Sequence, residues 1–209
     1  MNKKDILSKA KLYLIVDADL LEDEDLEKLT SGAIEGGADL IQFRGKTLTD
    51  GEFLKTAESL KKVTDHRNIP LIINDRVEIA LYLNTAGVHL GQEDLLISVT
   101  RKLLGEEKII GISASNLKEA KNAQTDGADY LGVGPVFYTR TKKIIKTVGL
   151  ELIREIKREI TIPFFAIGGI NLENMDEVRE SGADKIAVAS AVLKAKDPKL
   201  AARKLRDRL

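Results

Sequence analysis

Short aliphatic runs recur along the chain, and most are followed by a longer segment with helical spacing of its apolar residues. The runs span residues 12–16, 40–44, 71–73, 87–90, 109–113, 130–133, 164–167 and 185–188. Because they are nearly continuous in apolar residues, they are typical of parallel strands buried on both faces. The segments between them predict helices over residues 25–35, 50–65, 116–126, 150–159, 171–181 and 198–209, with Asn116 and Asn171 as N-caps.

A Gly-Ala-Asp phrase precedes three of these runs, at residues 37–39, 127–129 and 182–184. The glycine can end the preceding helix in the left-handed conformation, and the short turn then leads into the next strand. We interpret the phrase as a structural repeat.

Eight strand–helix units in 209 residues average about 26 residues each, which suits a compact (β/α)8 TIM barrel. We therefore predict one barrel domain over residues 1–209. A doubly wound open sheet is the alternative, but it would expose edge strands with polar or proline interruptions. Neither the first run nor the eighth has that character.

Composition narrows the function classes. The 33 basic and 33 acidic residues cancel, which disfavours a nucleic-acid partner, and the absence of cysteine excludes disulfides and thiolate metal sites. The first residues lack the apolar core of a signal peptide, and no run approaches the length of a membrane span. We expect a cytoplasmic protein without a membrane partner; a homo-oligomer is possible.

In a (β/α)8 barrel the active site lies at the carboxyl ends of the strands, so the residues after each run matter most. Gln42, Arg44 and Lys46 alternate after the second run and can share one side, where they would hold a polyanion. Asp75 and Asp94 follow neighbouring runs and suit a hard cation such as Mg2+. Two helix caps, or a merely solvated strand end, are the alternative interpretations.

The later runs end in groups that suit phosphate. Ser113 ends the fifth run and Ser115 follows it, without a His–Asp pair to activate either. Each hydroxyl therefore donates a hydrogen bond to phosphate or caps a helix. The segment after the sixth run is basic and predicts an anion-binding lid. Gly168-Gly169 and then Ala189-Ser190 follow the last two runs, where this fold commonly binds phosphate.

Two histidines complete the inventory. His89 lies inside an apolar run and is predicted to be a hydrogen-bonded core residue, and His66 is predicted to be exposed. Two anion sites therefore remain: one with cations and a metal, and one built from backbone amides. Together they suit a diphosphate and a monophosphate.

From Tyr13 to about Pro198, the chain resembles the thiamine phosphate synthase (thiamine-phosphate pyrophosphorylase) family. The matching motifs are Gln42-x-Arg44-x-Lys46, Ile73-Asn74-Asp75-Arg76-Val77, Val88-His89-Leu90-Gly91-Gln92-Glu93-Asp94, Gly132-Val133-Gly134-Pro135-Val136-Phe137, Thr139-x-Thr141-Lys142 and Ala166-Ile167-Gly168-Gly169-Ile170. The combination is specific, although no single motif is.

The resemblance implies a transferase that joins an aminopyrimidine diphosphate to a thiazole phosphate with one Mg2+ per active site. The implied diphosphate-substrate residues are Gln42, Phe43, Arg44, Gly45, Lys46, Asn74, Ser113 and Lys142, of which Arg44, Lys46, Ser113 and Lys142 act in catalysis. The implied metal ligands are Asp75 and Asp94. The implied thiazole phosphate residues are Thr139, Arg140, Thr141, Gly169, Ala189 and Ser190.

This sequence departs from the family pattern in three places. Residues 143–147 read Lys-Ile-Ile-Lys-Thr where an acidic residue and a Gly/Pro stretch are usual, Ser115 replaces a common His, and Ala189 replaces a larger aliphatic residue. A thiazole tautomerase and a non-catalytic phosphate-binding barrel are the alternatives. The acidic pair favours the synthase over both.

Overall fold

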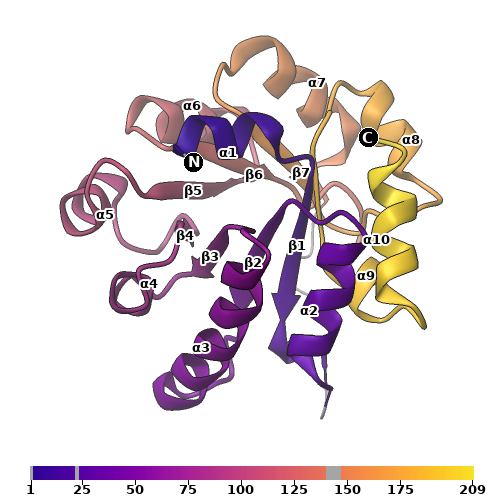
Figure 1. The fold of residues 1–209 in the computed structure, drawn as a ribbon. Helices are drawn as coiled ribbons and strands as arrows, with labels where there is room; N and C mark the ends of the chain where they lie inside the picture. Colours follow the sequence, from indigo (N-terminus) through magenta and orange to yellow (C-terminus); the bar gives the residue numbers. More distant parts are fainter. Residues whose placement is uncertain (1, 22–23, 140–146) are drawn as a thin grey trace.

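Eight parallel strands close into a barrel in chain order, with β1 paired to both β2 and β8 (Figure 1). The computed structural model describes residues 2–21, 24–139 and 147–209. The strands are β1 (Leu12–Asp17), β2 (Leu40–Arg44), β3 (Leu71–Asn74), β4 (Gly87–Leu90), β5 (Ile109–Ala114), β6 (Tyr130–Val133), β7 (Phe164–Ile167) and β8 (Ile186–Val188). The predicted (β/α)8 barrel is confirmed, and the doubly wound alternative is wrong because the sheet closes.

Helices surround the barrel, and α1 precedes the first strand (Figure 1). They are α1 (Lys3–Lys9), η1 (Ala18–Leu20), α2 (Leu26–Glu35), α3 (Asp50–His66), α4 (Val77–Tyr82), α5 (Ile97–Leu104), α6 (Leu117–Thr125), α7 (Gly149–Glu159), α8 (Met175–Glu180), α9 (Ser190–Leu193) and α10 (Pro198–Arg206). The sequence pattern did not predict α1, η1, α4, α5 or α9. Most of these are too short to show a clear period of 3.6 residues.

Capping decides where several helices begin. Thr49 and Glu52 form a reciprocal capping box at the start of α3, and Asn116 accepts the Glu119 N–H at the start of α6, as predicted. The prediction for Asn171 is wrong. Its side-chain oxygen accepts the N–H of Glu173 in a turn, and α8 begins only at Met175.

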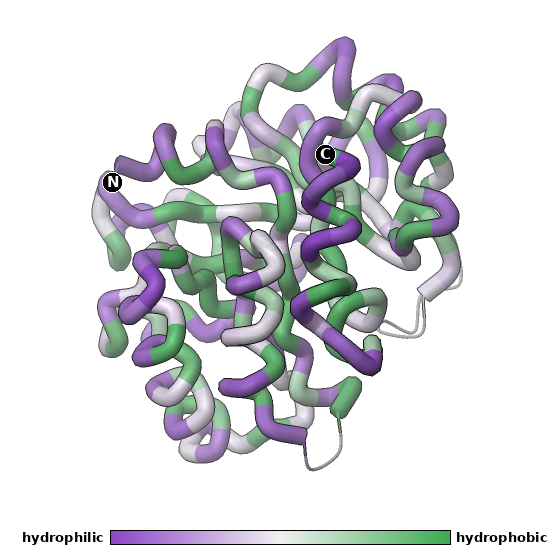
Figure 2. The backbone as a smooth tube through the Cα atoms, turned by 45° about the vertical axis from the view of Figure 1, so that its right-hand side comes forward, coloured by the Kyte–Doolittle hydropathy of each residue, from purple (hydrophilic) through white to green (hydrophobic). Residues whose placement is uncertain are grey.

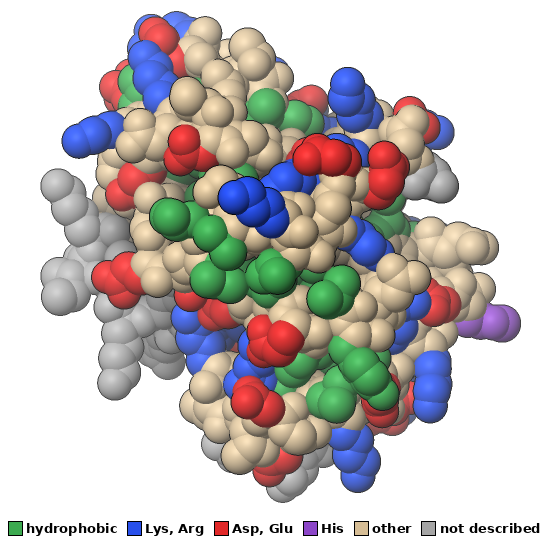
Figure 3. Space-filling view, turned by 90° about the vertical axis from the view of Figure 1, so that its left-hand side faces the viewer, with side chains coloured by type: hydrophobic (Ala, Val, Ile, Leu, Met, Phe, Trp, Pro, Cys, Tyr) green, Lys and Arg blue, Asp and Glu red, His purple; other side chains and the backbone are tan. Residues whose placement is uncertain are grey.

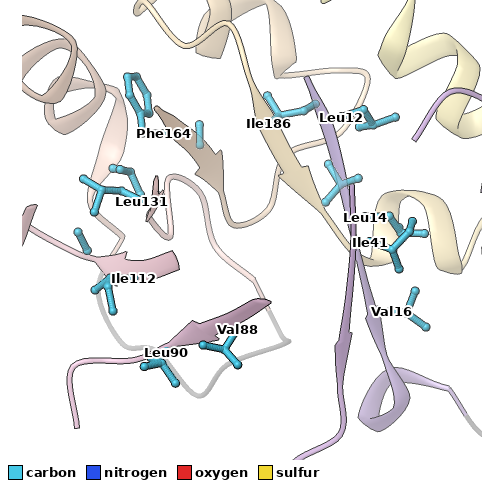
Figure 4. Packing of buried hydrophobic residues seen from close by; sticks show 14 of the residues in the cluster. Leu12, Leu14, Val16, Ile41, Val88, Leu90, Ile112, Leu131, Phe164 and Ile186 are labelled. Atoms are coloured by element: carbon cyan, nitrogen blue, oxygen red, sulfur yellow. The ribbon is translucent and has the colours of Figure 1, made fainter. Parts of the chain in front are cut away.

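Side chains of each strand alternate between the two faces of the barrel wall. Outward residues pack under the helices, and Figure 4 labels ten of them, among them Leu12, Leu14 and Val16 of β1. Inward residues such as Tyr13 and Ile15 form a separate cluster inside the barrel. The barrel is therefore a filled core, and Figure 2 shows how hydrophobic segments gather at its centre.

The Gly-Ala-Asp phrases have the structural role that we predicted. Gly37, Gly127 and Gly182 adopt φ angles of 104°, 94° and 106°, at which a residue with a side chain would be strained. The aspartates add ties that the sequence did not indicate. Asp39 accepts the backbone N–H groups of Lys11 and Leu12, and Asp129 accepts that of Ile110, so each carboxylate anchors the start of the preceding strand.

One outer face is apolar. Of the eight large hydrophobic residues that are exposed in the described part of the chain, six lie on or beside α4 and α5: Leu81, Tyr82, Leu95, Leu96, Val99 and Leu103. Figure 3 shows hydrophobic side chains gathering on this side. The face adjoins the loops that carry Asp75 and Asp94. Among the described helices, none has the length and hydropathy to cross a membrane.

Close strand packing at Gly87 gives a test of the fold. A Cβ at this position would lie 1.9 Å from the carbonyl oxygen of Ile109, so the β4–β5 pair would have to shift. We expect Gly87→Ala to lower the free energy of unfolding by about 1–3 kcal/mol. Urea denaturation measures it.

The matched control is Gly51→Ala in α3, where an added Cβ meets nothing within 4 Å. It should leave stability unchanged or raise it by up to about 1 kcal/mol. Equal losses in the two variants would contradict the packing argument.

Candidate active site

Most of the sequence-predicted site residues meet in one pocket at the carboxyl ends of the strands. The pocket has an empty volume of about 1090 Å³, its open mouth included. Its lining includes Gln42, Arg44, Lys46, Asn74, Asp75, Asp94, Ser113, Thr139, Gly169, Ala189 and Ser190. These residues come from strands or loops around the whole barrel, so only closure of the sheet brings them together.

Two predicted residues do not line this pocket. Phe43 is fully buried on the outer face of β2, where its ring lies 4.4 Å from that of Phe53 in α3. Gly45 is also turned away, and a Cβ there would lie 2.7 Å from Leu48. The side-chain alternation that sends Gln42 and Arg44 inward sends their neighbours outward. The side chain of Phe43 therefore does not reach this pocket, and the assignment of Phe43 to the substrate stays a prediction.

A buried ion pair holds Arg44. Its Nη1 lies 2.6 Å from Oδ2 of Asp17 and 3.1 Å from Oδ2 of Asp19. Burial raises the pKa of the Asp17 carboxyl, and the Arg44 guanidinium opposes that shift. Asp19 also accepts hydrogen bonds from the Lys46 N–H and from Thr47, and these lower its pKa although burial acts in the other direction. The two aspartates thus shape the whole Arg44–Thr47 segment.

Asp75 and Asp94 face each other as predicted. Burial, and next the hydrogen-bonded carboxyl of Asp94, raise the pKa of Asp75, while the ammonium of Lys46 at 3.1 Å lowers it. Neither aspartate caps a helix: α4 and α5 begin without a side-chain cap, and Asp94 accepts the N–H of Gly91. Two facing, partly buried carboxylates suit a divalent cation with oxygen ligands.

Within the described residues, no cluster of three or more His, Cys, Asp or Glu side chains could hold a metal ion by itself. A cation between Asp75 and Asp94 would therefore need further oxygen ligands from water or from substrate phosphate. Mg2+ commonly binds in this way, through one or two carboxylates and a phosphate.

The floor of the pocket is polar. His89 is buried and hydrogen-bonded, as predicted, with Nδ1 2.9 Å from the Tyr130 hydroxyl and Nε2 3.0 Å from Oγ of Ser113. Ser115 instead donates to the Glu119 side chain near the start of α6. The N-cap of that helix is Asn116, so the cap interpretation is wrong for Ser115. His66 is exposed, also as predicted.

The glycine loop lies on the opposite wall. Gly168 and Gly169 have φ angles of 101° and 65°, and added Cβ atoms would lie 2.4 Å from Pro135 and 2.5 Å from the Tyr138 carbonyl oxygen. Ala189, which lies between β8 and α9, and the exposed Ser190 of α9 face the same pocket. The other predicted residues of the basic segment, Arg140, Thr141 and Lys142, lie outside the described residues.

The sequence analysis missed Asp17, Asp19, Tyr13 and Tyr130. Asp17 ends β1 just as the selected residues end other strands, so the same rule could have found it. Tyr13 and Tyr130 occupy inward positions on β1 and β6, but an aromatic residue in an apolar run gives no sign of its hydroxyl's partner. Their partners come from distant strands.

The fold and the pocket define a (β/α)8-barrel protein with a charged active-site pocket at the carboxyl ends of its strands. A family model described as thiamine monophosphate synthase matches residues 12–192. The chain belongs to this family. It is accordingly an enzyme, a transferase of thiamine biosynthesis.

Named relatives match nearly the whole chain and support the assignment. The thiamine-phosphate synthase of Clostridium tetani is 47% identical over 194 residues, covering 93% of each chain. That of Clostridium novyi is 50% identical over 188 residues, covering 90% of this chain and 92% of the relative. The thiamine phosphate pyrophosphorylase structure from Pyrococcus furiosus superposes with a TM-score of 0.87 at 39% identity, covering 97% of this chain and 96% of that one.

A more distant likeness concerns the fold alone. The (S)-3-O-geranylgeranylglyceryl phosphate synthase of Thermoplasma acidophilum has a TM-score of 0.73 at 16% identity, covering 99% of this chain and 98% of that one.

The Asp17–Arg44 pair can be tested by a double-mutant cycle. Among the described residues, Asp17→Asn leaves the buried guanidinium with Asp19 as its one charged partner, so we expect a loss of about 3 kcal/mol in unfolding free energy. Replacing both residues, as Asp17→Asn with Arg44→Met, should cost less than the sum of the two single changes. Urea denaturation of the four proteins measures this coupling, and strictly additive losses would argue against a coupled pair.

Proposed function

We propose that the chain joins 4-amino-2-methyl-5-(diphosphooxymethyl)pyrimidine to a methylthiazole-ethyl phosphate, giving thiamine phosphate and pyrophosphate. With the carboxylated thiazole, CO2 is lost as well. One observation carries this proposal. An acidic pair, Asp75 and Asp94, lies beside the cations Arg44 and Lys46 in a pocket that the Gly168-Gly169 loop lines on its other side. We further propose that the enzyme works in the cytoplasm.

The diphosphate would lie beside β2, β3 and β5. Arg44 is held in place by Asp17 and Asp19, so it can meet an anion without first losing side-chain freedom. Lys46 is half exposed and forms an ion pair with Asp75. The other hydrogens of the Lys46 ammonium remain for phosphate oxygens. Asn74 and Ser113 line the same wall and offer uncharged donors. We infer that Lys142 acts with them.

Asp75 and Asp94 would hold one Mg2+. Burial, and next the neighbouring carboxyl of Asp94, raise the pKa of Asp75; a cation would offset the negative charge of the pair, and the two carboxylates match its preference for oxygen. When bound, it supplies positive charge that stabilises the departing diphosphate. Lys46 would then contact both the carboxylate side and the phosphate side of the site.

The thiazole phosphate would lie at the glycine loop. Gly169 exposes its backbone because it has no side chain, and the N-terminal turn of α9 with Ala189 and Ser190 lies across the same pocket. Thr139 lies nearby, and we assign Arg140 and Thr141 to this phosphate as well. A monophosphate needs only hydrogen-bond donors of this kind.

The reaction then follows from charge. The bond from the pyrimidinylmethyl carbon to the bridging oxygen breaks, and its electron pair leaves with the diphosphate. The thiazole nitrogen gives its lone pair to the resulting cation and forms the new C–N bond. Arg44, Lys46 and Ser113 stabilise the negative charge that develops on the leaving group, which is electrostatic catalysis rather than acid–base catalysis.

The two alternative functions make less use of these residues. A tautomerase or a silent phosphate-binding barrel would need one anion site, which the glycine loop supplies. Neither would use an acidic pair beside Arg44 and Lys46. Both alternatives predict distinct outcomes in one assay.

We expect the purified protein, given both substrates and Mg2+, to release pyrophosphate and thiamine phosphate in equal amounts, and to release neither without Mg2+. Asp94→Asn should lower turnover by about 100-fold or more. The matched control is Glu93→Gln, which removes an exposed carboxylate next in sequence and should leave turnover unchanged.

A pyrophosphate reporter and a chromatographic thiamine phosphate measurement give the readouts. Isomerisation of the carboxylated thiazole without metal or pyrophosphate release would establish the tautomerase. Binding of both phosphates without turnover would establish the silent barrel. Equal effects of the two variants would remove Asp94 from the metal site.

The glycine loop gives a separate prediction. Gly169→Ala places a Cβ 2.5 Å from the Tyr138 carbonyl oxygen at a φ of 65°, so the loop must move. We expect calorimetry to show about tenfold weaker thiazole phosphate binding, equivalent to about 1.4 kcal/mol, with pyrophosphate binding kept.

The matched control, Gly105→Ala, imposes a similar backbone strain at a φ of 80°, but its Cβ meets nothing within 4 Å and it lies away from the pocket. It should lower stability and keep both affinities. Weakening of both ligands by Gly169→Ala would point to general damage at this end of the barrel.

A further inference from the structure

A chain of four hydrogen bonds crosses the barrel beneath the pocket and joins Gln42 to Ser113. Nε2 of Gln42 lies 2.7 Å from the Tyr13 hydroxyl, which lies 2.8 Å from the Tyr130 hydroxyl. The Tyr130 hydroxyl lies 2.9 Å from Nδ1 of His89, whose Nε2 lies 3.0 Å from Oγ of Ser113. The five side chains come from β2, β1, β6, β4 and β5, so the chain connects two parts of the pocket wall that are not adjacent in the sheet.

The barrel interior makes room for the rings and holds them. An added Cβ at Gly111 would lie 2.1 Å from the Tyr130 ring, and one at Gly132 would lie 3.0 Å from the His89 ring. The ring of Phe165 packs edge-on against both tyrosine rings, with centroids 5.1 and 5.6 Å away. The geometry of the chain is therefore set by packing as well as by its own hydrogen bonds.

Both phenols keep their hydrogens. Burial raises the pKa of the Tyr13 hydroxyl and raises that of Tyr130 well above its ordinary range. Each phenolic oxygen has two of the other groups beside it, so each phenol accepts a hydrogen bond from one neighbour and donates one to the other.

These donor and acceptor roles give the chain of hydrogen bonds one direction, from Gln42 to Ser113. The amide nitrogen of Gln42 can only donate, so the Tyr13 oxygen accepts and its hydrogen goes to Tyr130. Tyr130 then donates to Nδ1 of His89, which must lack a hydrogen. In that imidazole tautomer Nε2 carries the hydrogen and donates it to Oγ of Ser113.

The other arrangements differ in ways that can be measured. A doubly protonated His89 would leave one phenolic hydrogen with no acceptor among these five side chains, at a cost in a buried site. A Gln42 amide turned by half a rotation would place its oxygen at Tyr13 and reverse every link, leaving the hydrogen on Nδ1. The tautomer of His89 therefore reports the direction of the whole chain.

We propose that this chain orients the hydroxyl of Ser113, and that Tyr13 and Tyr130 are positioning residues for it. The Ser113 oxygen accepts from His89, so its own hydrogen is left to point into the pocket that Ser113 lines. A donor held in this direction suits an anionic oxygen. If the proposed function holds, on which this last step rests, that oxygen belongs to the departing diphosphate.

The tautomer can be measured directly, and this measurement does not depend on the proposed reaction. The sequence has two histidines, His66 and His89. Imidazole 15N NMR of the histidine-labelled full chain at neutral pH gives both signals, and His66→Gln assigns them. We expect His89 to carry its hydrogen on Nε2. A hydrogen on Nδ1, or on both nitrogens, would overturn the proposed direction.

The positioning role can be tested by kinetics in two backgrounds. Tyr130→Phe removes the hydrogen bond at Nδ1, so we expect a mixture of His89 tautomers and about tenfold lower kcat, with a smaller change in the KM for the pyrimidine diphosphate. In a Ser113→Ala background, the same change should have little further effect because there is no hydroxyl to orient.

The matched control is Tyr82→Phe, the same substitution at an exposed tyrosine of α4, which should change neither the NMR signals nor kcat. An equal loss of kcat from Tyr130→Phe in both backgrounds would show that Tyr130 acts only on the stability of the barrel. If the wild-type protein makes no thiamine phosphate, the proposed function is wrong. The NMR measurement would still decide the direction of the hydrogen bonds between Gln42 and Ser113.

Discussion

Pairing of β1 with β8 is the constraint on which the rest of this structure depends, because it closes the sheet. In a closed sheet, the alternate side chains of all eight strands point into one interior. Residues as distant in sequence as Gln42 and Ser190 then face one pocket. Closure also removes the edges that an open parallel sheet would leave exposed.

Inside this frame the pocket is organised by opposing charges. Arg44 is held by two aspartates, and Lys46 is ion-paired with Asp75, which faces Asp94 in the same pocket. Each charged group therefore has a defined position before a ligand arrives. Such preorganisation is what a reaction with a strongly charged leaving group requires, since groups that need not rearrange stabilise the transition state most effectively.

The polar chain beneath the pocket has a different origin. Tyr13, Tyr130 and His89 occupy inward positions that an ordinary barrel would fill with aliphatic side chains. Their polar atoms are satisfied by one another, which avoids the cost of burying unpaired groups. The glycines at 111 and 132 give up side-chain packing to accommodate these rings.

The local pattern of the sequence determined much of this protein. All eight predicted strands begin and end within one residue of the observed ones, and β2, β4, β6 and β7 match at both ends, because apolar runs and glycine turns are local signals. The same pattern located the carboxyl-end residues, including Asp75 and Asp94. Only the tertiary structure decided that Phe43 faces a helix, that Asp17 holds Arg44, and which hydroxyl meets which partner. Those outcomes depend on contacts between strands distant in sequence, and no local period encodes them.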